Sequence, residues 1–449
     1  MSSYWKLHKF PILMVLISIV FYGSFAYDLD RSDFIKLITL SVGLFFLCFK
    51  IIQFEKWNFK FMITAGILFR LAFLLATPNL SQDFYRFIWD GELVSHGINP
   101  YLYTPDQLMA HGNLVIANAR ELHLGMGELS AMHFSNYPPL NQVLFAIATL
   151  FGGSSILGGI IAMRTIILLA DLGILIFGIR LLKHLNRSTY LIFWYFLNPL
   201  VIVELTGNLH FEGVMLFFFL ASIYLIAKNR WVWGGVLYAL SIMTKLVPLL
   251  FLPLFLKHFG IKKSMLFYSL IGATIVIGTL PFFTLEFISH YADTIGLWFS
   301  NFEFNASIYN VIKAIGSQMD VPAYEMIKVY GKIIPFLVIV LVLVFTFKRN
   351  NLTVSSLVTA MLWILSCYYF LSTTVHPWYI IFLVLLAIFT EFRFPLVWSL
   401  LVILSYWAYS NTQFQENLLI ISIEYLLVYG FLAYELINLN NKNLLFCKK

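Results

Sequence analysis

Apolar stretches long enough to cross a bilayer recur along the whole chain, and no other feature constrains its fold as strongly. A spanning helix needs about 20 mostly apolar residues to cross roughly 30 Å of hydrocarbon. The stretches are Phe10–Tyr27, Phe34–Phe54, Phe61–Ala76, Ile156–Leu182, Val214–Ala227, Leu266–Phe283, Ile333–Phe347, Val354–Leu371, Trp378–Phe389, Pro395–Tyr409 and Leu418–Leu436, with shorter pieces such as Leu140–Phe151. The pattern predicts an all-α, polytopic transmembrane protein with about 11–14 spans.

The composition agrees with this class. Apolar residues make up 60% of the 449 residues and charged residues only 11%, whereas a soluble domain carries about a quarter charged residues to hydrate its surface. No low-complexity linker or internal repeat divides the chain, so we expect a single membrane domain over residues 1–449. Lys6 and Lys9 before the first apolar run resemble the start of a signal peptide, but a retained first span is expected.

The placement of charge predicts the orientation. Basic clusters, which collect in cytoplasmic loops, occur at Lys6/Lys9, Lys56/Lys60, Lys183/Arg187, Lys257/Lys262/Lys263, Lys348/Arg349 and Lys442/Lys448/Lys449. Two long polar stretches, Pro78–Asn136 and Glu286–Gly331, carry more acidic than basic residues and are expected to form the first and second long non-cytoplasmic loops. The net charge of +7 therefore reports membrane orientation, and no nucleic-acid partner is expected.

The topology of residues 137–285 stays open. This region starts and ends on the non-cytoplasmic side and offers six apolar pieces, but simple alternation would place Lys183/Arg187 and Lys228/Arg230 outside. That placement contradicts the charge rule. Re-entrant half-helices, which are tolerated where protein or water covers the backbone, would resolve the conflict.

A charged and aromatic string begins the first long loop. Ser81 is a candidate helix cap, and residues 82–96 can form one helix that Gly97 ends. On this helix Asp83, Arg86 and Asp90 share one face. An amphipathic helix of this kind lies in the membrane interface. An ordinary surface helix with an Asp–Arg–Asp pairing is the simpler alternative.

The whole string resembles a known family. Asp83-Phe-Tyr-Arg-Phe-Ile-Trp-Asp90-Gly, Gly97-Ile-Asn-Pro-Tyr101 and Tyr137-Pro-Pro-Leu140 resemble the boxes of GT-C fold glycosyltransferases that use polyprenyl-phosphate sugars. The resemblance is greatest to the mannosyltransferase branch that includes the first GPI mannosyltransferase and bacterial relatives. Further matches are Asn198-Pro199, Gly207–Gly213, Thr244–Pro248 and His376–Tyr379. Many members carry paired acids in the first box, whereas here Gln82 precedes the single Asp83.

The resemblance implies an inverting glycosyltransferase of GT-C type. It implies that a hexose, by resemblance mannose, passes from a polyprenyl phosphate to a lipid, glycan or protein acceptor, with Asp83 as the catalytic base. The chemistry is consistent, because a lipid phosphate is a good leaving group and needs no general acid, whereas glycosidases need two carboxylates. No cofactor is expected, and the single acid of the box argues against a metal requirement. Arg86 and Asp90 are candidate substrate contacts.

Four other polar residues are candidate substrate contacts. Lys245 lies in an apolar run, where a charge costs roughly 3 kcal/mol on insertion scales and often marks a site; we expect it to bind phosphate, or else to pair with a buried acid. His210 and Glu212 lie in a glycine-flanked break suited to a sugar pocket. His376 is a candidate phosphate or hydroxyl ligand, while its neighbours Trp378 and Tyr379 are typical interfacial anchors.

Two other classes of function are compatible with the sequence. A transporter or flippase of a lipid-linked sugar without chemistry is the main alternative, although transporters usually show repeats and broken helices that converge at the midplane. A noncatalytic scaffold would leave Lys245 and the outer acids without a role. We expect membrane lipid, the donor and the acceptor as partners, and a bacterial inner membrane with a periplasmic site as the location. The sequence gives no oligomeric state.

Overall fold

A computed structural model describes residues 2–112, 114–300 and 302–446. The helices of the first half are α1 (Ser2–Tyr27), α2 (Phe34–Glu55), α3 (Phe59–Leu71), α4 (Asp83–Ser95), α5 (Pro105–His111), α6 (Ala119–Ala131), α7 (Pro139–Gly152), α8 (Ile156–His184), η1 (Thr189–Ile192), α9 (Phe193–Phe196), α10 (Pro199–Val201), η2 (Ile202–Gly207) and α11 (Glu212–Ala227). The second half holds α12 (Trp231–Thr244), η3 (Val247–Leu254), α13 (Phe255–Phe259), α14 (Ile261–Thr279), η4 (Leu280–Phe282), α15 (Leu285–Ser300), α16 (Ile308–Gln318), α17 (Ala323–Phe347), α18 (Val354–Leu371), η5 (Pro377–Tyr379), α19 (Ile380–Ile388), α20 (Phe394–Leu401), η6 (Val402–Ser410) and α21 (Leu418–Phe446).

The fold is all-helical and polytopic, as the apolar runs predict. Within the described residues no β-strand forms, and an isolated parallel bridge joins Phe304 and Thr374. Seven helices are long and apolar enough to cross a membrane, or up to eight if the bent pair 189–196 and 199–207 is one span. Six further apolar helices are shorter, which is why the count by helix length is below the expected 11–14.

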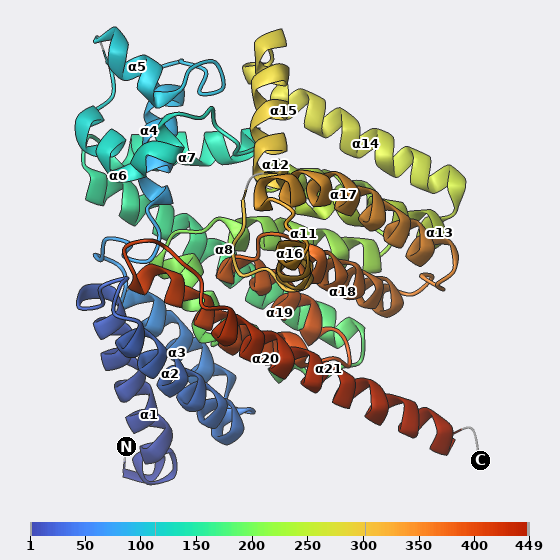
Figure 1. The fold of residues 1–449 in the computed structure, drawn as a ribbon. Coiled ribbons are helices and arrows are strands. Elements are labelled where there is room, and N and C mark those ends of the chain that lie inside the picture. The colour runs from blue at the N-terminus through green and yellow to red at the C-terminus, as the bar shows by residue number, and fades with distance from the viewer. Residues whose placement is uncertain (1, 113, 301, 447–449) are drawn as a thin grey trace.

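One of these shorter helices resolves the topology of residues 137–285. The side chain of Asn118, in the first long loop, donates a hydrogen bond of 2.7 Å to the carbonyl of Ser154. The turn between α7 and α8 therefore lies at the same end of the bundle as the start of α7. Figure 1 shows α7 beside α4 and α6, away from both chain termini. The segment Leu140–Phe151, counted as a possible span, lies in a helix shorter than the candidate spans; it packs on α4 and α8 along one face and leaves Leu150 and Phe151 exposed.

Long-range hydrogen bonds show which loops share the end of the bundle that holds α4. The amide of Asn141 donates to the carbonyl of Thr244 at 2.7 Å, and that of Asn99 donates to Phe282 at 2.9 Å. The last residues of α12 and η4 therefore lie at this end. We call it the α4 end.

The basic loops lie at the opposite end. Arg187 donates to the carboxylate of Glu391 and the carbonyl of Thr390, both at 2.7 Å. Lys257 donates to the carbonyl of Phe347, also at 2.7 Å. Because α7 does not cross, α8, the bent pair, α11, α12, η3–α13 and α14 alternate between the two ends. The loops after α8 and between α11 and α12 then fall with the other basic clusters, and the conflict with the charge rule disappears.

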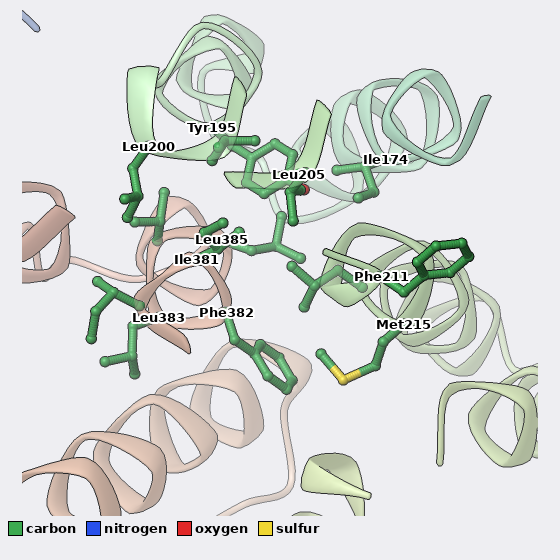
Figure 2. Close-up of a cluster of buried hydrophobic side chains, with 14 of the residues drawn as sticks. Ile174, Tyr195, Leu200, Leu205, Phe211, Met215, Ile381, Phe382, Leu383 and Leu385 are labelled. Carbon is green, nitrogen blue, oxygen red and sulfur yellow. The ribbon is translucent and has the colours of Figure 1, made fainter. Parts of the chain in front are cut away.

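A buried apolar cluster includes side chains from both ends of the helix break at 208–211. Figure 2 shows Ile174 of α8, Leu205 of η2, Met215 of α11 and Phe382 of α19 among its side chains. These residues are at most 1% exposed. Leu205 lies just before the helix break at 208–211 and Phe211 is the last residue of that break. Burial of these two side chains therefore holds both ends of the break in place.

Candidate active site

Helix α4 is held in place by a buried polar network. Arg86 donates to Asp90 at 2.7 Å and to the carbonyls of Ser130 and His133. The second carboxylate oxygen of Asp90 accepts from Ser135 at 2.6 Å and from Gln142 at 3.1 Å. Because the groups of this network satisfy one another inside the protein, the geometry favours a positioning role for Arg86 and Asp90 over direct substrate contact.

Asp83, the first residue of α4, stands apart from this network. Its backbone N–H donates to the hydroxyl of Ser81 at 3.3 Å. Burial raises the pKa of the Asp83 carboxyl above its ordinary value, and the positive charges of Lys245 and Arg31 partly oppose that shift. The Asp–Arg–Asp pairing of the simpler alternative therefore does not form: Arg86 pairs with Asp90, and the charges that act on Asp83 come from distant parts of the chain.

Lys245 reaches the α4 end because α12 stops at Thr244. The ammonium forms an ion pair with Glu212, the first residue of α11, and lies 5.5 Å from the ring centre of Tyr379. Its side chain remains 30% exposed, so N–H donors not used by Glu212 can reach a ligand. Burial lowers the pKa of Lys245, and the charge of Asp83 opposes the change.

The break between η2 and α11 places His210 beside the other candidates. The side-chain carbonyl of Asn208 accepts from the backbone N–H of Leu80 at 3.3 Å, which attaches the break to the segment before Asp83. Leu209 takes a left-handed φ of 63° to turn the chain here. His210 is 3% exposed and its Nε2 has no hydrogen-bond partner.

Aromatic rings extend from His210 across the site. Trp378 stacks between His210 at 3.8 Å and His376 at 4.4 Å, measured between ring centroids. His376 stacks in turn on Phe304 at 5.0 Å. Trp378 and Tyr379 were expected to be interfacial anchors. In the structure Trp378 lies between two histidines, and the ring of Tyr379 lies near Lys245.

Both histidines are held neutral. Burial lowers the pKa of His376 to about 3, and the charges of Lys245 and Arg31 add to the effect. Burial and the charge of Lys245 likewise lower the pKa of His210 well below its ordinary value. The Nδ1 atom of His376 is buried without a partner. The Nε2 atom of His210 lies 3.6 Å from a carboxylate oxygen of Glu204, beyond hydrogen-bond distance. Neutral imidazoles whose ring nitrogens lack a hydrogen-bond partner can donate to or accept from sugar hydroxyls.

One further charged residue, Arg31, was not predicted from the sequence. Arg31, in the turn between α1 and α2, lies over the ring of Tyr409 at 3.4 Å from the ring centre. It is one of two cations whose charge lowers the pKa of Asp83. A single arginine among three aspartates in a short loop, Asp28–Asp33, was the only available signal.

The donor set gives no sign of a metal site. Among the residues that the structure describes, no three His, Cys, Asp or Glu side chains converge in a way that could hold a metal ion. Gln82, the residue before Asp83, donates its amide to the carbonyl of Met126 at 3.0 Å. This side chain joins α4 to α6, so its role in this chain is structural.

Comparisons with known proteins converge on one family. The family model of the alpha-(1->6)-mannopyranosyltransferase N-terminal domain matches residues 24–259, more than half of the chain. The matched range contains Arg31, Asp83, His210, Glu212 and Lys245, whereas His376 lies beyond it.

Curated relatives are similar over shorter ranges. Alpha-(1->6)-mannopyranosyltransferase A of Mycobacterium tuberculosis is 26% identical over 197 residues, which are 42% of this chain and 36% of the relative. The protein of the same name in Corynebacterium glutamicum is 22% identical over 184 residues, 40% of this chain and 35% of the relative. Alpha-(1->6)-mannopyranosyltransferase B of that organism is 28% identical over 156 residues, 34% of this chain and 24% of the relative. The matches thus span about a third of the relatives' length or less, and no solved structure matches this chain.

Proposed function

The chain belongs to the family of alpha-(1->6)-mannopyranosyltransferases, and from this premise we propose that it transfers mannose from a polyprenyl phosphate to a glycan acceptor with inversion at the anomeric carbon. The observation that carries the proposal is that Asp83 forms no ion pair with a described residue, while the charges of Lys245 and Arg31 act on it. The Arg86–Asp90 pair lies outside this group. One base and a set of cations are what transfer from a lipid phosphate requires.

In the proposed reaction, an acceptor hydroxyl attacks C1 of the mannose. The bond between C1 and the phosphate oxygen breaks, and its electron pair leaves with the phosphate. Asp83 takes the proton from the attacking hydroxyl. Burial raises the pKa of this carboxyl, which makes it a stronger base than a solvated aspartate. No general acid is needed, because the phosphate leaves as a stable anion.

The remaining candidates divide by charge. We assign Lys245 to the phosphate, where its ammonium stabilises the charge that develops as the bond breaks. Glu212 holds that ammonium in position through their ion pair. His210 and His376, both neutral, are assigned to sugar hydroxyls. Arg86 and Asp90 position α4, and with it Asp83.

The charge pattern supports a location for this site. Basic loops gather at the end opposite to Asp83, and the two acidic stretches belong to the α4 end. By the charge rule the α4 end is non-cytoplasmic. We therefore propose a bacterial inner membrane with the site on the periplasmic side, where a polyprenyl donor holds its head group at the interface.

The test is transfer by membranes that contain the protein. Synthetic polyprenyl-phosphomannose with labelled sugar is supplied with an α-linked mannooligosaccharide, and the linkage of the product is determined. We expect a 1→6 linkage with the wild type and a loss of about 100-fold or more with Asp83→Asn, typical of removing a general base.

A matched control separates catalysis from damage to the loop. Asp106 lies on the same long loop, is 49% exposed and pairs with His123 at 2.7 Å. Asp106→Asn should retain wild-type transfer. Equal transfer by wild type and Asp83→Asn would refute the assignment of the base. Movement of the lipid-linked sugar across the membrane without any transfer would favour the transporter alternative.

A further inference from the structure

Arg31 is held at the site by contacts that do not use its guanidinium. The amide of Asn79, four residues before Asp83, donates to the carbonyls of Phe25 at 2.7 Å and Leu29 at 2.8 Å. These two hydrogen bonds attach the turn between α1 and α2 to the segment that leads into α4. Nearby, Phe34 packs edge-on against Trp407 of η6 at 5.1 Å. The position of Arg31 is thus fixed from two sides.

The guanidinium of Arg31 makes no hydrogen bond or ion pair with the described residues. Its Nε is buried without a hydrogen-bond partner, and its contact with the Tyr409 ring neutralises no charge. Three buried arginines elsewhere in the described chain each donate several hydrogen bonds to protein oxygens, although Nη2 of Arg70 has no partner. Arg70 donates to Asp171 and two carbonyls, Arg86 to Asp90 and two carbonyls, and Arg164 to three carbonyls.

A series of ring contacts links the guanidinium of Arg31 to His376 of the candidate site. The Tyr409 ring, over which Arg31 lies, has its centroid 5.9 Å from the centroid of the Phe304 ring. The Phe304 ring in turn stacks on His376. Tyr409 also contacts Tyr406 at 5.8 Å, and the hydroxyl of Tyr406 donates to Glu204 at 2.7 Å. The charge of Arg31 opposes the rise in the pKa of Asp83 and adds to the lowering of the pKa of His376.

We propose that Arg31 binds the phosphate of the lipid-linked donor and, together with Lys245, stabilises the departing phosphate anion. This inference rests on the proposed function, which it extends by a phosphate ligand from the turn between α1 and α2. A guanidinium presents a planar fork of N–H donors that matches phosphate oxygens and stays charged at every relevant pH. Lys245 forms an ion pair with Glu212, whereas Arg31 forms no ion pair with a carboxylate of the described residues.

The first test is binding, which does not depend on turnover. The purified full chain in detergent is titrated with a polyprenyl phosphate and, separately, with the polyprenol of the same chain length. The wild type should prefer the phosphate, and Arg31→Ala should weaken phosphate binding about 10- to 100-fold, as expected for a lost hydrogen bond to a charged group. Binding of the alcohol should stay unchanged. Inorganic phosphate as competitor shows whether the anion is recognised without its lipid.

A matched control tests whether any exposed arginine has the same effect. Arg180 also lies near an aromatic ring, that of Phe177 at 5.8 Å, but it is exposed near the last turn of α8 at the opposite end of the bundle. Arg180→Ala should bind both lipids like the wild type. An equal preference for the phosphate in Arg31→Ala and wild type would overturn the proposal.

A second measurement avoids substitution, in case Arg31→Ala does not fold. The wild-type protein is treated with an arginine-selective dicarbonyl reagent, and modification of Arg31 is followed by peptide mass spectrometry. The polyprenyl phosphate should slow modification of Arg31 at least several-fold, and the polyprenol should not. Equal modification in the presence of either lipid would refute the assignment. Absence of mannose transfer by a wild type that shows this protection would refute the proposed function and leave the phosphate site standing.

Discussion

Gly91 offers a direct test of how far the packing of α4 controls the site. A Cβ atom at this position would lie 2.5 Å from the carbonyl oxygen of Phe145 on α7, and ordinary contact begins at 3.4 Å. Gly91→Ala therefore forces α4 and α7 apart by about 0.9 Å. The obstacle is backbone, so no change of side-chain rotamer can relieve it. Overpacking of this size costs about 1–3 kcal/mol of folding free energy.

The displacement also reaches the proposed base. Asp83 lies about 12 Å from Gly91 along the same helix axis, at 1.5 Å per residue. A rigid helix carries the shift to its first turn, and a misplacement of about 1 Å can cost roughly 100-fold in rate. We expect Gly91→Ala to lower kcat for mannose transfer by about 10- to 100-fold and to lower the melting temperature in detergent.

Another glycine provides the control. A Cβ atom at Gly272, within α14, would meet nothing within 4 Å, and alanine is favoured over glycine inside a helix by about 0.5–1 kcal/mol. Gly272→Ala should keep wild-type activity and melting temperature or raise the latter slightly. Wild-type kcat and melting temperature in Gly91→Ala would show that α4 is not rigidly fixed on α7 and would refute the reasoning.

Three other predictions concern charge. Because burial raises the pKa of Asp83, kcat/KM should fall as the pH drops through values above the ordinary carboxyl pKa, and the acid limb measured with the wild type should vanish in the residual activity of Asp83→Asn. Because the pKa of His376 is lowered from 6.5 to about 3, between these two pH values the unfolded chain binds a proton that the folded protein does not. Folding stability should therefore fall as the pH drops from 6.5 towards 3. A series of melting temperatures measured across this range should show a smaller fall for His376→Phe than for the wild type. Glu212→Gln should leave Lys245 without its partner and lower stability by about 1–3 kcal/mol, less than for a fully buried pair because Lys245 is 30% exposed; an unchanged melting temperature would show that the pair contributes nothing.

The class of the fold, the helix that begins at Asp83 and the helix break that holds His210 could be predicted from local sequence. Runs of apolar residues are a local property with a length fixed by the bilayer, so the all-helical membrane class followed without tertiary information. The helix from Asp83 to Ser95 also agrees with expectation, since Gly97 ends it as predicted. The sequence identified the break that holds His210 from its flanking glycines.

The same local signals could not separate a membrane-spanning helix from one that packs on protein. Pro139–Gly152 is apolar, and an apolar helix is buried equally well by lipid or by other helices. The hydrogen bond from Asn118 to Ser154 decides its place, and this contact joins residues that no periodicity relates. The order of the crossings through residues 137–285 depended on that one helix.

Which charged residues pair with one another could be read only from the tertiary structure. Helical spacing predicted that Asp83, Arg86 and Asp90 share one face. In the structure Ser135 and Gln142, from other segments, donate hydrogen bonds to Asp90. Asp83 does not join this network, and the charges of Lys245 and Arg31 act on it instead. Arg31 joins the site from 52 residues earlier, a distance along the chain that local patterns do not encode. The sequence by itself thus determined the membrane class, the acidic loop and the family resemblance, because these reside in short segments. Only the tertiary structure decided which charges pair with each other and which are left free to meet a substrate, because pairing depends on contacts between segments far apart in the chain.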